Sequence, residues 1–561
     1  MKNILKLITL LSLSSSFAFG ISIPNSSTIN KDIKVPKNIQ KNEKGLIELD
    51  NIKKYLPAMI GDKSGKTIFV KEFSFTGNTQ FTDSQLKNLL EKYLNKELSF
   101  NSLKNATTVI TKYYRDKGYL VARAYLPVQK MENAVVSIAI IEGTFGKFKL
   151  NNNSLVKDKV VQNIFNELKK EKIISSLTLE RAMLIVNDTP DIIVTKADIK
   201  PGEKVGESDF EIETSSTNSY DGYILLDNHG SRYTGENRVM GGLNINSPFK
   251  IGDELSLIAL LSRKTDLKYG HIVYDALLHP SGLKGGVEYS YSNYQLGKEY
   301  QDLDATGSSK VVALNLSYPI IRQRDNSLYT TLKLSNKKNT DDEAVTDSNT
   351  QKELNVLTTG LEYDLNTYTD AFPTQYNIKA EYTYGDLSFK DEVSLNQDKA
   401  GADTQGNYSK VYLELQQVVR MTNNLSLDTK FSYQHSLDNK NLDGSEDFSI
   451  SGASGVRVYP STEASGENGY IFSIEPQYTL PSFYGISNTL GVFYDRAKVY
   501  MANSSNVDSQ DIDLQDIGIS YYSTYKDFFL NSYIAWKLNS DTITSEDDYN
   551  SKFLAQVGWV F

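Results

Sequence analysis

The chain ends in the stretch "SKFLAQVGWVF", residues 551–561. Apolar and mostly aromatic side chains occupy every second position of this stretch: Phe553, Ala555, Val557, Trp559 and Phe561. Successive side chains of a β-strand point to opposite faces, so these five share one face. An aromatic residue at the end of such a face has no partner in water, whereas lipid accommodates it. The stretch therefore predicts the closing strand of a membrane-spanning antiparallel β-barrel.

The rest of residues 217–561 repeats this alternation in about 16 segments, separated by clusters of Gly, Asn, Asp and Ser. Connections after even-numbered segments are short, whereas several after odd-numbered ones are long: residues 338–352, 386–407, 438–468 and 538–550. A soluble β-sandwich or β-helix has no reason to sort loop length in this way. An outer-membrane barrel does, because its periplasmic turns are short and its extracellular loops are long. We therefore predict a transmembrane antiparallel barrel of about 16 strands.

Composition supports a membrane barrel and limits the possible chemistry. The chain has 36 Tyr and 2 Trp, no Cys, and a formal net charge of -9. Amphipathic tyrosine rings suit the interfaces of a membrane, and the acidic balance argues against nucleic acid as a partner. The four His residues are scattered without metal spacing, and the chain has neither a nucleophile elbow nor a Walker-type loop. We expect no catalytic residue, metal or cofactor.

The N-terminus has the pattern of an export signal. Lys2 and Lys6 flank the start of an apolar run, and small residues around Ala18 and Gly20 suggest cleavage after residue 20. Residues 21–65 are polar and rich in Lys, and they predict a linker in which "LIELDNIKKYL", residues 46–56, is a possible short plug helix.

Residues 66–145 and 146–216 predict two small α/β modules with the same order of elements. In the first, "IFVKEFSF" predicts a strand, and Thr82 with Gln85 forms a capping box that begins a helix. A second helix ends near Gly118, and two strands follow. Strand, two helices and two strands then recur immediately, which indicates a repeated module.

Three stretches carry a resemblance to a known family. "GYLVARAYLPVQ" with "IIEG" is similar to the paired strands of a POTRA domain, and "DNHGSRYTGENR" and "YPIIRQRDNSLY" resemble parts of a barrel. In this order they resemble the two-partner secretion transporters, the TpsB branch of the BamA superfamily. The resemblance implies a bacterial outer-membrane pore with periplasmic POTRA domains. Such a pore would translocate an unfolded TpsA-type exoprotein, an adhesin or haemolysin, without nucleotide.

Two other functions stay open at this point. A barrel-assembly insertase of the BamA type would carry more POTRA modules than the two predicted, and a passive porin would have no use for periplasmic modules.

The resemblance also assigns roles to individual residues. Val456, Arg457, Val458 and Tyr459 are similar to the tetrad at the tip of a loop that folds back into the barrel. In the family the tetrad arginine pairs with an aspartate of the inner wall, and the matching residue here is Asp495. The tetrad usually has Gly at its third position, and Gly adopts positive φ far more easily than Val. The sequence therefore does not fix the backbone conformation of the tip at Val458. On residue chemistry alone, Arg457 could equally be a solvated loop arginine.

Trp559 and Phe561 resemble the C-terminal signal that the barrel-assembly machinery recognises. The alternative is that both simply face lipid. The expected partners are thus the exoprotein, the assembly machinery and outer-membrane lipid.

Overall fold

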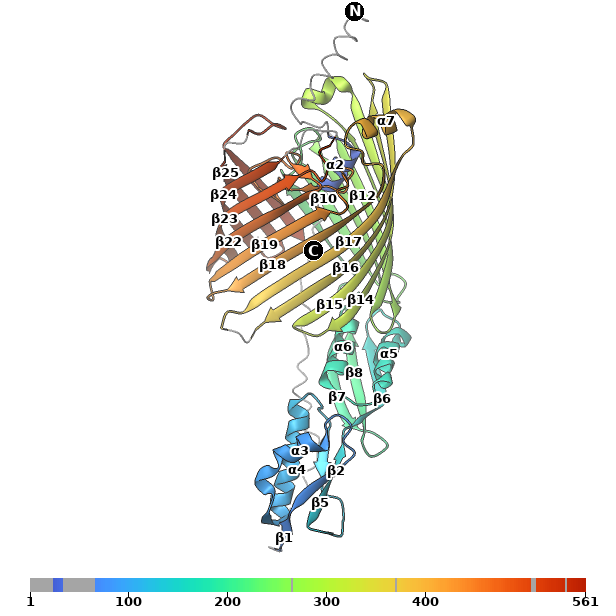
Figure 1. The fold of residues 1–561 in the computed structure, drawn as a ribbon, viewed down its shortest axis with the longest axis vertical. Coiled ribbons are helices and arrows are strands. Elements are labelled where there is room, and N and C mark those ends of the chain that lie inside the picture. Colours follow the sequence, from blue (N-terminus) through green and yellow to red (C-terminus); the bar gives the residue numbers. More distant parts are fainter. Residues whose placement is uncertain (1–23, 34–65, 264–265, 369–370, 506–510, 540–541) are drawn as a thin grey trace, which may run out of the picture.

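The computed structural model describes residues 24–33, 66–263, 266–368, 371–505, 511–539 and 542–561. Two α/β modules lie in line below one large β-barrel (Figure 1). The predicted signal peptide and the helix predicted at 46–56 lie outside the described residues. No helix in the described part is long and apolar enough to cross a membrane.

The first module packs two helices against short strands. Its elements are β1 (Thr67–Val70), β2 (Glu72–Thr76), α3 (Asp83–Leu89), η3 (Glu91–Tyr93), β3 (Lys96–Ser99), α4 (Phe100–Asp116), β4 (Arg123–Tyr125) and β5 (Val135–Ile141). Thr82 caps α3 with the predicted capping box. The prediction of one continuous strand from Ile68 to Phe75 was wrong, because the chain bends at Lys71. In one continuous strand, the side chains of Val70 and Phe73 would point to opposite faces. The bend between them lets both side chains reach the core.

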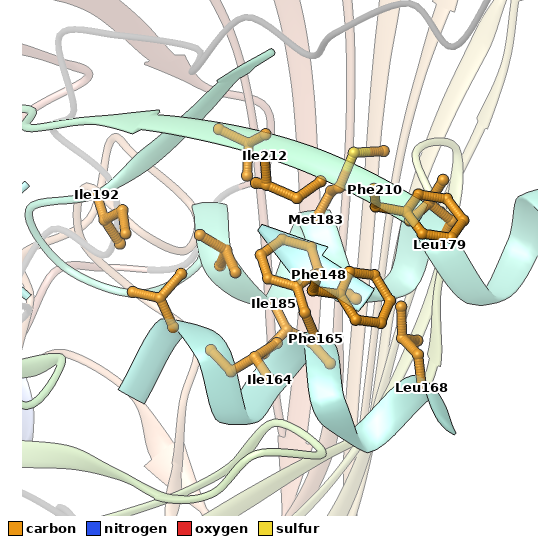
Figure 2. Packing of buried hydrophobic residues seen from close by; sticks show 14 of the residues in the cluster. Phe148, Ile164, Phe165, Leu168, Leu179, Met183, Ile185, Ile192, Phe210 and Ile212 are labelled. Atoms are coloured by element: carbon orange, nitrogen blue, oxygen red, sulfur yellow. The ribbon is translucent and has the colours of Figure 1, made fainter. Parts of the chain in front are cut away.

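The second module follows directly and repeats the order of elements. It contains β6 (Thr144–Asn153), α5 (Asp158–Glu167), η4 (Leu168–Lys170), α6 (Ser176–Asn187), β7 (Ile193–Pro201) and β8 (Glu207–Ser215). The sheet order is β6-β8-β7. Phe148 and Phe210 from the sheet and Phe165 from α5 meet in the buried core (Figure 2).

Sixteen antiparallel strands close into the barrel, as predicted. They are β9 (Tyr220–Asp227), β10 (Arg238–Asn246), β11 (Asp253–Ser262), β12 (Leu267–His279), β13 (Leu283–Gln295), β14 (Ala305–Arg322), β15 (Asn326–Glu343), β16 (Ser348–Thr367), β17 (Thr374–Phe389), β18 (Gly406–Arg420), β19 (Leu425–Ser436), β22 (Asn468–Phe483), β23 (Ile486–Tyr500), β24 (Ile512–Tyr525), β25 (Phe528–Lys537) and β26 (Ser551–Val560). Closure pairs β26 with β9 over Gln556–Val560.

The connections away from the modules differ from the predicted loops in one respect. Residues 338–352 were expected to form a long loop, but β15 and β16 stay paired as far as Glu343 and Ser348. Farther along, the connection from β17 to β18 contains the short helix α7 (Glu392–Ala400). The strands β14–β18 thus extend beyond their neighbours on the side away from the modules (Figure 1).

A short helix that the sequence analysis missed lies inside the barrel. α2 (Ser26–Asp32) begins at a capping box of Asn25 and Thr28, and Ile29 and Ile33 are buried against the barrel wall. The region expected to be a linker therefore contributes a helix to the lumen (Figure 1).

The second module is joined to the barrel by charged groups at the end of α6. Arg322 donates two hydrogen bonds to the Asp188 carboxylate, both of 2.7 Å, in a bidentate arrangement. Arg181 of α6 donates to the carbonyl oxygen of Pro319 at 2.6 Å. The short turns of the barrel therefore lie on the side of the modules.

Candidate functional site

The connection between β19 and β22, residues 437–467, turns back into the barrel. It carries two short paired strands, β20 (Phe448–Ser449) and β21 (Ser465–Gly466). Val456, Val458 and Tyr459 of the tetrad are buried, and they pack with wall residues of β23, β24 and β25. The apolar stripe at the tip is thus the part of the loop that contacts the inner wall.

Arg457 lies between two acidic side chains of neighbouring strands. Its Nη1 donates a hydrogen bond of 2.9 Å to Glu475 Oε2 on β22, and its Nε lies 3.2 Å from Asp495 Oδ2 on β23. The Ser473 hydroxyl donates to Asp495 Oδ1 at 2.5 Å. Asp495 is fully buried, and Arg457 is 7% exposed. The fork of the guanidinium suits this arrangement, because its donors point to both carboxylates at once.

Two aromatic rings complete the surroundings of the guanidinium. Its Cζ atom lies 3.8 Å from the ring centroid of Phe493 and 5.0 Å from that of Tyr533. A ring face attracts a cation and also keeps water away from it. The ion pairs are therefore screened less than a pair on the surface.

A third acid, Asp516 of β24, holds the backbone of the tetrad. Its Oδ2 accepts a hydrogen bond of 2.7 Å from the Val458 N–H, and Asp516 stands directly opposite Asp495 in the strand register. Val458 is not among the described residues with positive φ, and its side chain is completely buried. Valine at the usual glycine position therefore adopts ordinary backbone geometry and fills space against the wall.

Sequence reasoning named Asp495 but missed Glu475 and Asp516. Both follow a readable signal, since each is an acid with the inward parity of its strand and is followed by an apolar residue of the outward face, Pro476 or Ile517. Tyr459 also finds a wall contact, because its hydroxyl donates to the Asn539 Oδ1 atom at 2.6 Å.

The loop and helix α2 occupy the lumen together. Ser26 donates to the Asp341 carboxylate on β15 through its N–H at 2.6 Å and its hydroxyl at 2.8 Å. On the loop, Asp443 pairs with Lys352 at 2.7 Å and Glu446 pairs with Lys410 at 2.9 Å. Lysines of the wall thus hold acids of the loop, and one wall acid, Asp341, holds the helix.

A buried carboxylate also organises the first module. Glu142, from the "IIEG" stretch, accepts hydrogen bonds from the N–H groups of Thr79 and Gln80 and from the Tyr114 hydroxyl. Burial, and then the bond to this carboxylate, raise the pKa of Tyr114 well above its usual range. The tyrosine therefore remains a donor and fixes the turn before α3.

The C-terminal aromatics lie on the outer face at the seam of the barrel. Trp559 is exposed, and its ring centroid lies 4.8 Å from that of Phe561. The N–H and carbonyl of Phe561 exchange hydrogen bonds of 2.9 and 3.0 Å with Gly222 of β9. Phe561 therefore extends the pairing that closes the barrel.

The described residues contain no group of three or more His, Cys, Asp or Glu placed to hold a metal ion. What the geometry offers is a barrel whose lumen holds an anchored loop and a helix, with two modules on the side of the short turns. These features define a transmembrane β-barrel with a filled lumen and attached modules.

Two family models identify the class more closely. Residues 206–512 match the model described as "Haemolysin secretion/activation protein ShlB/FhaC/HecB", and residues 68–143 match "POTRA domain, ShlB-type". The chain belongs to this family, the TpsB transporters of two-partner secretion. It is an outer-membrane translocation pore for an exoprotein, with its POTRA domains in the periplasm.

Individual relatives agree with this assignment. The chain is 27% identical over 474 residues to the heme/hemopexin transporter protein HuxB of Haemophilus influenzae strain 86-028NP. The matched residues make up 83% of this chain and 82% of HuxB. It is 23% identical over 322 residues to the outer membrane transporter CdiB of Dickeya dadantii strain 3937, covering 54% and 55% of the two chains.

Solved structures share the fold. CdiB from Escherichia coli superimposes with a TM-score of 0.73 at 18% identity, covering 91% of this chain and 94% of that one. BamA from Haemophilus ducreyi without POTRA domains 1–3 gives 0.51 at 16% identity, covering 88% and 100%.

Proposed function

We propose that the two modules capture the exoprotein while it is unfolded and pass it to the barrel. The sheets of both modules have outer strands that pair with another strand on one side only, namely β2 and β4 in the first and β6 and β7 in the second. An extended peptide can add a strand to such an edge through main-chain hydrogen bonds, which need no particular sequence. This mode of capture suits a long chain that has not yet folded.

In this proposal the 437–467 loop acts as the latch of the pore and helix α2 as a plug. The observation that carries it is the anchor of Arg457 on Glu475 and Asp495 deep in the wall. While the anchor holds, the loop and the helix fill the lumen, so a passing chain needs both to move. Folding of the exoprotein outside then biases transit outward without nucleotide.

HuxB similarity extends over more of the chain than CdiB similarity. We therefore take a secreted haem- or hemopexin-binding protein as the first exoprotein to test, before other adhesins or haemolysins. The assembly machinery and outer-membrane lipid complete the proposed set of partners. Trp559 and Phe561 would be the signal that the machinery reads.

Removal of this chain from the producing cell tests the proposal. We expect one exoprotein, encoded beside the transporter, to accumulate inside the cell and disappear from the surface and medium. Loss of many different barrels would instead identify an insertase, and loss of small-solute uptake alone a porin. Complementation with the intact chain has to restore secretion of the same exoprotein.

A further inference from the structure

Three lysines stand on the outer face of the barrel wall, on the side away from the modules. They are Lys268 on β12, Lys310 on β14 and Lys338 on β15, and all three are exposed. Strand parity fixes their direction: Lys310 shares its face with the exposed Val312 and Leu314, whereas Val311 and Ala313 between them are buried. These lysines therefore point toward the membrane and not into the lumen.

Their level corresponds to the outer boundary of the apolar belt. Lys310 precedes Ile320, an exposed apolar residue near the module side, by ten residues. At about 3.3 Å per residue and a strand tilt of about 40°, this separation spans about 25 Å along the membrane normal, the height of the apolar band of a barrel. Lys310 thus lies where the phosphate groups of the surface leaflet begin.

The described chain offsets the charge of these lysines only in part, through a Lys338–Glu353 ion pair and a contact of the Lys310 ammonium with the Tyr291 ring, 5.9 Å from its centroid. Lys310 and Lys338 are direct partners in the strand register, and like charges in such positions repel. Among the described residues the nearest acid is Glu353, 3.7 Å from Lys338, and Glu353 also pairs with Lys390. Neither Lys268 nor Lys310 forms an ion pair with a described acid. The group is therefore left with a net positive charge.

Basic residues on another part of the outer wall lack this excess. On β23, Arg496 pairs with Asp513 at 2.9 Å, and Lys498 pairs with Asp511 at 3.0 Å. The excess of positive charge on β12–β15 thus has no counterpart at these positions of β23.

An apolar hollow lies directly below the pair of lysines. It has a volume of about 410 Å³; its outer-face lining includes the apolar Val312, Leu314, Leu334, Leu357 and Tyr384, together with the amides Asn336 and Asn355, which hydrogen-bond to each other. In the register, Leu314 and Leu334 face each other four pairs below Lys310 and Lys338. Cationic groups above an apolar hollow match an anionic head group with its acyl chain beneath it.

We propose that Lys268, Lys310 and Lys338 bind the phosphate groups of a phosphorylated glycolipid of the surface leaflet. Its acyl chain would occupy the hollow between β14 and β17. A phosphate between Lys310 and Lys338 would replace their repulsion with two charge-assisted hydrogen bonds. This site goes beyond the proposed transport function, and its failure would leave that function intact.

Thermal unfolding of the purified full chain in detergent tests the site, with lipid A as the bisphosphorylated probe. We expect lipid A to raise the melting temperature of the natural protein, and its phosphate-free form to have no comparable effect. In the double variant Lys310→Gln/Lys338→Gln, we expect a melting temperature without lipid at least equal to that of the natural protein. Its apparent affinity for lipid A should be at least tenfold lower.

Lys498→Gln is the matched control, because it removes an outward lysine that has an acid partner, and it should keep the full response. The proposal is overturned if the double variant responds to lipid A like the natural protein. It is also overturned if phosphate-free lipid or inorganic phosphate alone gives the same shift, since either result removes the phosphorylated lipid as the ligand.

Discussion

Arg457 is one cation among three buried acids, and this ratio determines how the loop can move. Glu475, Asp495 and Asp516 are all less than 5% exposed. Removing one partner of a buried ion pair typically costs 3–5 kcal/mol, because the other charge stays behind without compensation. The loop can therefore leave the wall only if water or another chain replaces the guanidinium. An unfolded polypeptide that enters the lumen would be such a chain, and water would enter with it.

Val458 is the residue at which this chain departs from the usual tetrad, and Val458→Gly tests what the departure does. The substitution empties the space of a fully buried side chain and frees the backbone, so we expect the anchored loop to lose about 2–4 kcal/mol. Limited proteolysis of intact cells should then cut the 437–467 segment faster. Cleavage at the natural rate would show that the valine contributes no anchoring.

At the scale of elements, helix α2 shows the limit of sequence reasoning. The capping box of α3 was readable because Thr82 and Gln85 precede an apolar helical pattern. The α2 box uses Asn25 and Thr28 over only seven residues, and a helix this short does not form without tertiary contacts. Its contacts are Ile29 and Ile33 with the barrel wall, about 200 or more residues away in the sequence. No local pattern could have indicated them.

The long pairing of β15 with β16 was missed for a related reason. Apart from Ala344 and Val345 in the turn, residues 336–352 are polar on both faces, so the period-two signal of the membrane belt is absent there. The two strands continue there through backbone pairing. Inward lysines such as Lys337 and Lys352 form ion pairs with acids of the loop.

A disulfide between α2 and the loop tests whether the two elements must separate. A Cβ atom at Gly444 would lie 3.8 Å from the Ser27 Cβ atom, a separation that suits a disulfide. The natural chain has no Cys, so Ser27→Cys/Gly444→Cys can form only this bridge. We expect secretion to stop in the oxidised double variant and to return on reduction.

Each single-cysteine variant is the control and should secrete normally. Full secretion by the oxidised double variant, with the bridge verified by mass spectrometry, would contradict the plug and latch mechanism.

At the scale of the whole molecule, the prediction of the fold was confirmed, and the reasons are physical. A lipid-facing wall imposes period-two patterning, and the two sides of a membrane impose two classes of connection, so both are visible in one sequence. The contact partners inside the lumen follow no such rule. The pairing of Arg457 with Asp495 was expected from the family resemblance and strand parity, whereas the contacts of the acids on β22 and β24 with the tetrad became evident only from the closed barrel.

Deletion of Phe561 tests the C-terminal seam. The change removes two backbone hydrogen bonds to Gly222 and the ring next to Trp559, so both closure and the proposed assembly signal weaken. We expect several-fold less folded barrel in outer-membrane fractions, measured by heat-modifiable migration at equal transcript level. Phe561→Tyr should retain most of the barrel, and Phe553→Ala, on the same face, should have a small effect. An unchanged amount after the deletion would argue against the signal.

The central claim is that the anchored loop controls translocation, and secretion by Arg457→Ala and Asp495→Ala tests it most directly. Arg496→Ala is the matched control, because Arg496 follows Asp495 on β23 but pairs with Asp513 on the outer face. With equal amounts of folded barrel, the account predicts strongly reduced exoprotein in the medium for the first two variants and natural secretion for the third. Full secretion by both Arg457→Ala and Asp495→Ala would contradict the account.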